Sequence, residues 1–360
     1  MKEKSSAFRL TMPLFAVATL LPAALMLCGV FFGGGWVWLG FLYMGGLALV
    51  LDQVIPLVPA DAEDGAEFPA SDAILVAVGL GHLMLLPATV WEISAGADLS
   101  PLTRGLLFLA AGYWFGQVAH PAAHELIHRP GRGLFWLGGA IYTTLLMGHH
   151  TSAHRLVHHI HVATDKDPNS APAGMGFWTF APRAWVGSFR AGWSAESRLS
   201  QGRKRVHPYL IYLAGAVLSL ALGYGLGGMA GVAVWLGLGL HATLQILLAD
   251  YIQHYGLRRA LRPDGKAEPV RTEHSWNTPH WFSQAMMLNA PRHSDHHAHP
   301  ARPYPALRLP QDAPLLPWPL PVAGAVAMVP RLWKRRMKTR LARVQSTAQP
   351  TESAALPKAD

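Results

Sequence analysis

Histidine is the residue type in this chain that most clearly indicates chemistry, with 19 histidines among 360 residues. Nine of them form four clusters in the sequence, and neighbours within a cluster are one, three or four positions apart. The nine are His124, His128, His154, His158, His159, His254, His293, His296 and His297. Spacings of three and four place side chains on one helical face, one turn apart. Such a face can offer several neutral imidazoles to a metal, and imidazole-rich sites suit iron, copper, nickel or zinc.

The number of histidines predicts more than one metal ion. One ion accepts about four to six ligands, so nine imidazoles divide naturally between two ions. The only cysteine is Cys28, which excludes a thiolate metal site and a fused ferredoxin-like or rubredoxin-like module. A redox enzyme of this kind would therefore receive its electrons from another protein.

Other polar residues near the clusters have secondary roles in this interpretation. We expect the carboxylates of Glu125, Asp250 and Asp295 to orient ligand imidazoles. His149, His150 and His161 are additional nitrogen groups, and three interpretations remain open for them: they support the ligands, they are exposed, or they are structural. His299 has no helical partner in register, so we expect it to be exposed.

The first cluster, HELIH, also has the spacing of the zinc-protease motif HExxH. Taken alone, it would be ambiguous between a metal site and two structural histidines. A zinc protease needs one further ligand rather than seven further histidines, so the other clusters favour the larger metal site.

The composition predicts an integral membrane protein. Hydrophobic residues make up 51% of the chain and charged residues only 14%, against about 25% charged residues in soluble domains. A spanning helix needs about 20 mostly apolar residues. Six segments meet this requirement: residues 8–32, 36–58, 72–92, 103–121, 208–227 and 229–250.

We therefore predict an all-α fold, a bundle of six transmembrane helices with a histidine-rich cap on the cytoplasmic side. Residues 1–345 would form one membrane domain, and residues 346–360 a disordered tail. The apolar stretch 134–148 lies between two histidine clusters and is interpreted as a buried or half-inserted helix. Prolines interrupt the stretch 315–330, which favours an interfacial segment.

The positive-inside rule gives the predicted orientation. Lys2, Lys4 and Arg9 place the N-terminus inside, and six crossings then bring all four clusters to the cytoplasmic face of the inner membrane. The net charge of +9 is consistent with cytoplasmic loops and anionic lipid headgroups. The sequence has no basic patch with interleaved aromatic residues, so it gives no indication of nucleic-acid binding. The basic segment Arg331–Arg343 is interpreted as a headgroup contact or as a docking site for an acidic electron donor.

The four clusters resemble the histidine boxes of membrane-bound alkane monooxygenases. The matching segments are HELIHR, AHRLVHHIHVAT, DYIQHYGL and RHSDHHAHPARPY, and GGGWVWLG resembles the related xylene monooxygenase hydroxylase. The resemblance implies that the nine histidines bind two iron ions. It also implies O2 as cosubstrate, a medium-chain n-alkane hydroxylated at its terminal C–H, and electrons from rubredoxin, itself reduced by an NAD(P)H-dependent rubredoxin reductase.

This chain departs from the boxes at positions that are not among the nine histidines. The departures are Ala153, Val157, Asp250, Gln253, Ala290 and Pro291. Two of them, Ala153 and Gln253, stand where the family has glutamate. The absence of these two glutamates would change the hydrogen bonding around the metals.

Three alternatives remain open at this stage. Methyl-group oxidation of xylene or toluene is one, and a fatty-acyl desaturase or hydroxylase is another, although the latter typically has eight box histidines and lacks the HYGL element. A membrane protein that binds or transports metal is the third. Transport needs ligands near the membrane midplane, whereas these clusters lie past one end of the bundle. For His82 and His241, which lie inside predicted spans, we expect hydrogen bonds between helices.

Overall fold

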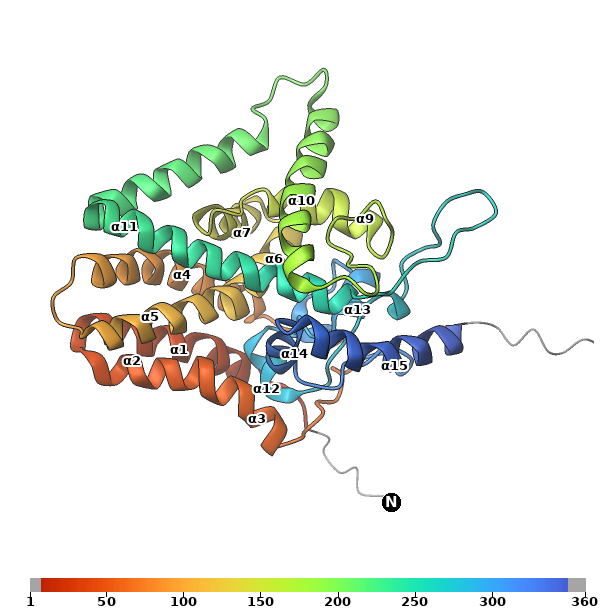
Figure 1. Cartoon of the computed structure of the whole chain (residues 1–360), viewed down its shortest axis with the longest axis horizontal. Helices are drawn as coiled ribbons and strands as arrows, with labels where there is room; N and C mark the ends of the chain where they lie inside the picture. Colours follow the sequence, from red (N-terminus) through yellow and green to blue (C-terminus); the bar gives the residue numbers. More distant parts are fainter. Residues whose placement is uncertain (1–7, 349–360) are drawn as a thin grey trace, which may run out of the picture.

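The computed structural model describes residues 8–348. In this range the chain forms α-, π- and 3₁₀-helices, with two isolated β-bridges and no extended strand. The predicted all-α class is therefore confirmed. Long helices form a bundle at one end of the molecule, and short helices and loops form a cap at the other (Figure 1).

The first two long helices form a tight hairpin. Helix α1 (Met12–Phe32) ends at Gly33, whose φ of +103° few other residues adopt, and the chain reverses into α2 (Gly34–Phe41). Helix α2 continues through the π-helical η1 (Leu42–Leu47) into α3 (Ala48–Val54). The two helices pack so closely at Gly29 that a Cβ there would lie only 2.5 Å from the side chain of Val37.

The next two long helices carry the first histidine cluster out of the bundle. Helix α4 (Ser71–Ser94) is followed by α5 (Pro101–Trp114), which Ser100 caps. The chain then runs without a break through the π-helical η2 (Phe115–Ala119) into α6 (His120–His128). The helix therefore extends two turns beyond the end predicted at residue 121.

Helix α7 (Arg132–Thr144) folds back against α6. Its 13 residues span about 20 Å, which is too short to cross a hydrocarbon layer of about 30 Å. Gly138, Gly139, Ile141 and Tyr142 are buried. This length and burial fit the prediction of a buried or half-inserted helix for this stretch.

The second histidine cluster lies on three short consecutive segments, α8 (His150–Ala153), the π-helical η3 (His154–His158) and α9 (His159–His161). Helix α10 (Phe177–Ser200) then leads to α11 (Pro208–His254). The backbone of α11 is not helical at Gly227 and Gly228, so α11 consists of two arms (Figure 1). The arms correspond to the predicted segments 208–227 and 229–250.

The cap is completed by short elements after α11. They are η4 (Thr272–His274), α12 (Trp281–Met286), α13 (His293–Ala298), η5 (Tyr304–Ala306), α14 (Leu320–Ala327) and the basic α15 (Pro330–Ala348). Lys2, Lys4 and residues 349–360 of the predicted disordered tail lie outside the described residues.

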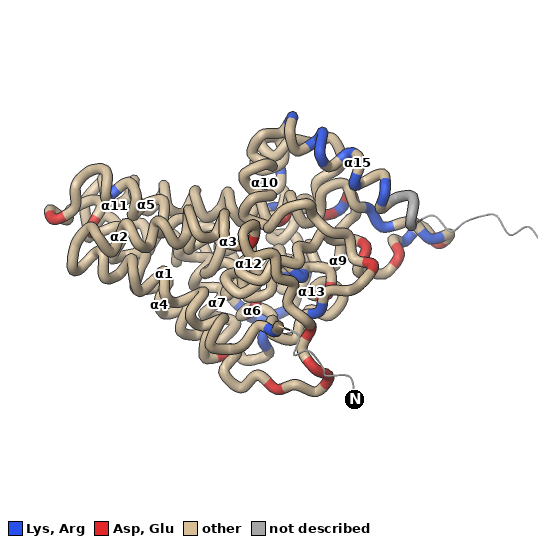
Figure 2. The backbone as a smooth tube through the Cα atoms, turned by 90° about the horizontal axis from the view of Figure 1, so that it is seen from below, with Lys and Arg blue, Asp and Glu red and all other residues tan. Residues whose placement is uncertain are grey.

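The surface of the bundle identifies a membrane protein. Four helical segments in the described range are long and apolar enough to cross a membrane: Met12–Phe32, Gly34–Val54, Ser71–Ser94 and Pro208–His254. Large apolar side chains on them are exposed, for example Leu218 at 70% and Met229 at 72%. Charged residues gather mainly around the cap and are sparse on the bundle (Figure 2).

Candidate metal centre

The structure brings the nine predicted histidines together into two adjacent groups at the base of the bundle. The first group comprises His124, His128, His154, His159 and His296, and the second comprises His158, His254, His293 and His297. Within each group the candidate ligand nitrogens lie within 4.8 Å of one another. The groups adjoin, because the rings of His159 and His297 have centroids 4.6 Å apart.

The π-helical turn of η3 determines how the second cluster is divided. A π-helix closes its hydrogen bonds between residues i and i+5, so His154 and His159 share a face. Their Nε2 atoms lie 2.9 Å apart in the first group. His158, which α-helical spacing pairs with His154, instead faces the second group, where its ring lies 4.8 Å from that of His254.

The nitrogens that point into the two groups suit a metal. The Nε2 atoms of His124, His128 and His158 are buried and have no hydrogen-bond partner among the described residues. The other six inward Nε2 atoms meet only each other, at 2.9–3.2 Å. Imidazole–metal bonds of about 2.1 Å put opposite ligands about 4.2 Å apart, which is close to the observed spread. The residues present therefore fit a pair of nitrogen-ligated metal ions.

The environment of eight of the nine histidines, all except His158, lowers their pKa values and so favours the neutral imidazole that binds metals. Burial, followed by the neighbouring imidazoles, lowers the pKa of His159, His296 and His297 well below the usual value of a histidine. A neutral imidazole retains a lone pair, which is the group that a metal ion requires.

Asp167 is a supporting residue that the sequence analysis missed. Its Oδ2 lies 2.9 Å from Nδ1 of His158 and also accepts a hydrogen bond from Ser170. Although burial opposes both charges, this contact raises the pKa of His158 and lowers that of Asp167. A carboxylate on Nδ1 leaves Nε2 of His158 free to face the second group. The turn-forming segment DPNS, directly after the second cluster, was the available signal.

The three predicted carboxylates contact groups other than the nine histidines. Glu125 accepts from the backbone N–H of Tyr304 at 3.1 Å and pairs with Arg129 at 3.7 Å. Asp250 accepts from the Asn169 side chain at 2.6 Å. All three are buried and connect the segments that carry ligands.

Asp295 shows why one expectation about the fourth cluster was wrong. It binds Arg302 through both carboxylate oxygens at 2.6 Å, and its Oδ1 lies 2.9 Å from Nδ1 of His299. His299 is 54% exposed, as expected, yet it does have a helical partner in register. The partner is Asp295, an acidic side chain four residues earlier, whereas the expectation considered only histidines as partners.

The buried side chain of Arg292 fixes the position of the fourth cluster. Its guanidinium is buried and contacts Asp61, the carbonyl oxygens of Pro59 and Leu307, and Oε1 of Gln284. These bonds tie the loop between α3 and α4 to the residue that precedes His293. A segment distant in the sequence thereby fixes the start of α13.

The remaining histidines surround the two groups without joining them. His149 lies 3.3 Å from the Ser188 hydroxyl, and His161 is half-buried. His150 is buried, and its Nε2 has no partner among the described residues. His120 was not singled out from the sequence. Its Nδ1 lies 3.0 Å from the Tyr142 hydroxyl, and it lines a small pocket with His124 and His150.

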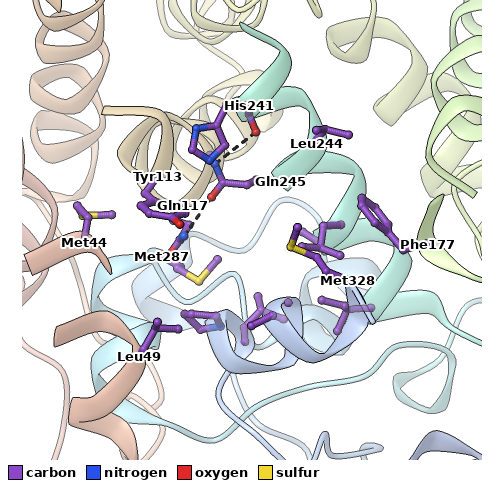
Figure 3. Close-up of a pocket in the computed structure, with 18 of the residues that line it drawn as sticks. Met44, Leu49, Tyr113, Gln117, Phe177, His241, Leu244, Gln245, Met287 and Met328 are labelled. Atoms are coloured by element: carbon purple, nitrogen blue, oxygen red, sulfur yellow. Dashed lines mark hydrogen bonds between the residues drawn. The ribbon is translucent and has the colours of Figure 1, made fainter. Parts of the chain in front are cut away.

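An apolar cavity of about 250 Å³ adjoins this small pocket, and Figure 3 shows the residues that line the cavity. Its walls come from the second arm of α11, from η1, α3, α5, η2 and α14, and from the start of α10. Ala249, Met287 and Leu320 line both the cavity and the histidine-lined pocket, so the two spaces share a boundary. The arrangement can hold an aliphatic molecule with one end toward the first histidine group.

Two of the departures from the family boxes meet beside this pocket. Gln253 donates through Nε2 to the carbonyl oxygen of Ala290 at 3.1 Å, and both residues line the pocket. This bond ties the end of α11 to the segment before α13. A glutamate at position 253 would lack the amide hydrogen that makes this bond.

Comparison with known proteins agrees with the geometry. The family profile "Fatty acid desaturase" matches residues 100–345. Alkane 1-monooxygenase 2 of Pseudomonas aeruginosa is 30% identical over 316 residues, which cover 84% of this chain and 83% of the relative. Alkane 1-monooxygenase 2 of Alcanivorax borkumensis is 29% identical, with 85% and 83% covered.

A further relative is the xylene/toluene monooxygenase hydroxylase component of Pseudomonas putida, 27% identical, with 85% of this chain and 83% of the relative covered. The matched range of the family profile includes all four histidine clusters and both candidate metal groups. The chain therefore belongs to the fatty acid desaturase family and, within it, groups with the alkane 1-monooxygenases.

Proposed function

We propose that this protein is a membrane-bound di-iron monooxygenase that hydroxylates the terminal carbon of an apolar, medium-chain hydrocarbon. The observation that carries the proposal is the boundary shared by an apolar cavity and a pocket lined by histidines of both groups. The nine histidines are the proposed ligands, with one iron ion in each group. The chemistry that iron would supply at these histidines is activation of O2: one oxygen atom would enter the C–H bond, and two electrons from a separate donor, with two protons, would reduce the other to water.

The residues of the chain would bind, orient and protect the substrate. The apolar walls from η1, α11 and α14 exclude water and hold an alkyl chain by burial alone. Met287 and Leu320 at the boundary would aim one end of that chain toward the histidines. Asp167 would keep His158 in the tautomer whose Nε2 faces the second group.

The finer topology belongs to this proposal. Six crossings follow if the continuous helix Pro101–His128 and each arm of α11 count as spans. The cap would then lie on the cytoplasmic side of the inner membrane, within reach of a soluble electron donor. Residues 1–345 would form a single membrane domain, as predicted from the sequence.

The proposed electron donor is a rubredoxin that an NAD(P)H-dependent reductase keeps reduced. In support, Cys28 is the only cysteine, so the chain carries no cysteine-ligated redox centre of its own. The basic helix α15 projects from the cap and offers positive charge to an acidic partner or to lipid headgroups (Figure 2). Neutralising Lys334, Arg335, Arg336 and Lys338 together distinguishes the two. Unchanged turnover at low donor concentration would exclude the docking role.

The test of the proposed function is product identification. Full-length protein in lipid, supplied with rubredoxin, reductase, NADH and octane, should form octan-1-ol and lose this activity when iron is removed by chelation. A double bond introduced into an acyl substrate, with no octanol, would instead identify a desaturase. Zinc at one atom per chain with no O2 consumption would contradict the monooxygenase.

A second candidate function is hydroxylation of an aromatic methyl group. The relative that favours it is the xylene/toluene monooxygenase hydroxylase component, which matches 85% of the chain. Supplying toluene beside octane in the same assay separates the two. Benzyl alcohol as the main product would favour the second candidate.

The boundary between the cavity and the histidine-lined pocket gives a prediction about substrate positioning. Replacing Met287 with phenylalanine should fill space at this boundary and lower octane turnover by about tenfold to a hundredfold, because small misplacements of the reacting carbon are costly. Iron content should stay at the wild-type value. Met328→Phe is the control and should keep wild-type turnover, because Met328 lines the cavity but not the histidine-lined pocket and is 46% exposed. Equal turnover in both variants would show that substrate does not pass Met287.

A further inference from the structure

Three polar side chains, His241, Gln245 and Gln117, lie on one wall of the apolar cavity, and a hydrogen bond joins the two amides (Figure 3). Gln117 belongs to η2, and the other two belong to the second arm of α11. Polar groups in an apolar environment lose free energy unless they are hydrogen-bonded. The pairing of the two amides therefore shows which amide atom remains available, in addition to Nδ1 of His241, which is also buried without a partner among the described residues.

The amide of Gln245 has only one consistent orientation. Its Nε2 lies 2.8 Å from the carbonyl oxygen of Gly112 and 3.4 Å from that of His241. Carbonyl oxygens only accept hydrogen bonds, so the nitrogen of the amide must face them. Its Oε1 consequently faces Gln117 and accepts from Nε2 of that residue at 3.0 Å.

This orientation determines what Gln117 can offer to a ligand. Its Nε2 is committed to Gln245, which leaves Oε1 as an acceptor. That oxygen is buried and has no hydrogen-bond partner among the described residues. A buried acceptor without a donor is unfavourable, and a ligand that supplies an O–H would relieve that cost.

The backbone is shaped around these polar side chains. A Cβ at Gly112 would lie 2.0 Å from Nδ1 of His241, and one at Gly116 would lie 2.5 Å from the amide of Gln245. These two glycines therefore let the polar side chains of α11 lie directly against the neighbouring helix. Gln117 also sits on a π-helical segment, a feature that is frequent at functional sites.

The position of Gln117 relates this acceptor to the histidines. Gln117 and His124 are seven residues apart on one continuous helical run, which is about 10 Å along the axis. The cavity that Gln117 lines shares Ala249, Met287 and Leu320 with the histidine-lined pocket. A chain molecule held at Gln117 by one end could extend its other end toward the histidines.

We propose that the cavity binds an aliphatic alcohol, whose hydroxyl donates a hydrogen bond to Oε1 of Gln117 while its alkyl chain runs toward the histidine groups. This inference rests on the proposed function for the outcome of binding, since hydroxylation of the distant carbon would convert the alcohol into a diol. The binding step itself needs no turnover. A water molecule that serves Gln117 in place of the ligand is the competing explanation.

The test compares three ligands with equal numbers of non-hydrogen atoms: octan-1-ol, 1-methoxyheptane and nonane. Equilibrium binding of each radiolabelled ligand to full-length protein in lipid nanodiscs is measured without reductant and corrected with empty nanodiscs. We expect octan-1-ol to bind about tenfold more tightly than the ether, because only the alcohol donates a hydrogen bond. Equal affinities would show that water serves Gln117, and would overturn the proposal.

Variants then assign the preference to the acceptor. Gln117→Met keeps an unbranched side chain but removes the oxygen, so the alcohol-to-ether ratio should fall to about one, with nonane binding retained. Leu244→Met, elsewhere on the cavity wall, should keep the wild-type ratio. A ratio unchanged by Gln117→Met would contradict the proposal. If Gln117→Met does not fold, the wild-type comparison of alcohol and ether still decides.

The outcomes separate this inference from the proposed function. If the protein prefers the alcohol but hydroxylates neither octane nor octan-1-ol, the alcohol-binding site is supported and the proposed function is contradicted. If the protein hydroxylates octane but binds the alcohol and the ether equally, only the alcohol-binding site is contradicted.

Discussion

Replacing His154 with alanine is expected to deplete iron from the first histidine group, and replacing His293 is expected to deplete the second. His154 lies centrally among His124, His128 and His159, with ring centroids 4.4–5.3 Å away. Nε2 of His293 lies 3.0 Å from Nε2 of both His254 and His297. Because each residue contributes to one group, each variant should lose about one of two iron atoms per chain.

Activity should fall by at least about a hundredfold in both variants. Loss of a residue that only hydrogen-bonds to a metal ligand already lowers metal affinity or activity by about tenfold to a hundredfold. Iron per chain measured by elemental analysis, beside octanol formation, checks this. The matched control is His161→Ala, which removes a half-buried histidine of the nearby helix α9 that belongs to neither group. Wild-type iron content in both the His154 and His293 variants would show that the groups do not hold the metal.

The second large effect is expected from Asp167, which supports the second group without belonging to it. Asp167→Asn preserves the shape of the side chain but removes the negative charge beside His158. The imidazole becomes a weaker ligand, so iron affinity or turnover should fall by about tenfold to a hundredfold. A chelator titration of the iron, followed by the octane assay, measures both effects.

Asp165 provides a control two residues away. Its side chain is 97% exposed, and its nearest charged partner is Arg258 at 3.6 Å. Asp165→Asn should therefore leave iron affinity unchanged, because exposed ion pairs contribute little. If both aspartate variants behaved like the wild type, the tautomer of His158 would not depend on Asp167.

Hydropathy and histidine spacing predicted the apolar helices and the residues that gather at the base of the bundle. Both signals are local, since an apolar stretch of sufficient length forms a spanning helix wherever the rest of the chain lies. The division of His154, His158 and His159 between two groups could not be predicted, because it depends on a π-helical turn rather than an α-helical one. Hydrogen bonds that span five residues in place of four change which side chains share a face of the helix.

Tertiary contacts account for the other differences. Asp250 and Asp295 were chosen for their closeness to histidines in the sequence, yet they bind Asn169 and Arg302, while Asp167 reaches His158 through a turn. Gln117 and Gln245 form a hydrogen bond on the cavity wall, although they are more than a hundred residues apart in the sequence. Such pairings depend on how helices pack, which the periodicity of one helix does not encode.

The proposed metal centre holds a pair of iron ions, one in each histidine group. Anomalous scattering at the iron absorption edge, measured on crystals of the full-length protein, tests it most directly. We expect two peaks, one enclosed by His124, His128, His154, His159 and His296 and one by His158, His254, His293 and His297. A single peak, or iron bound outside these groups, would contradict the account.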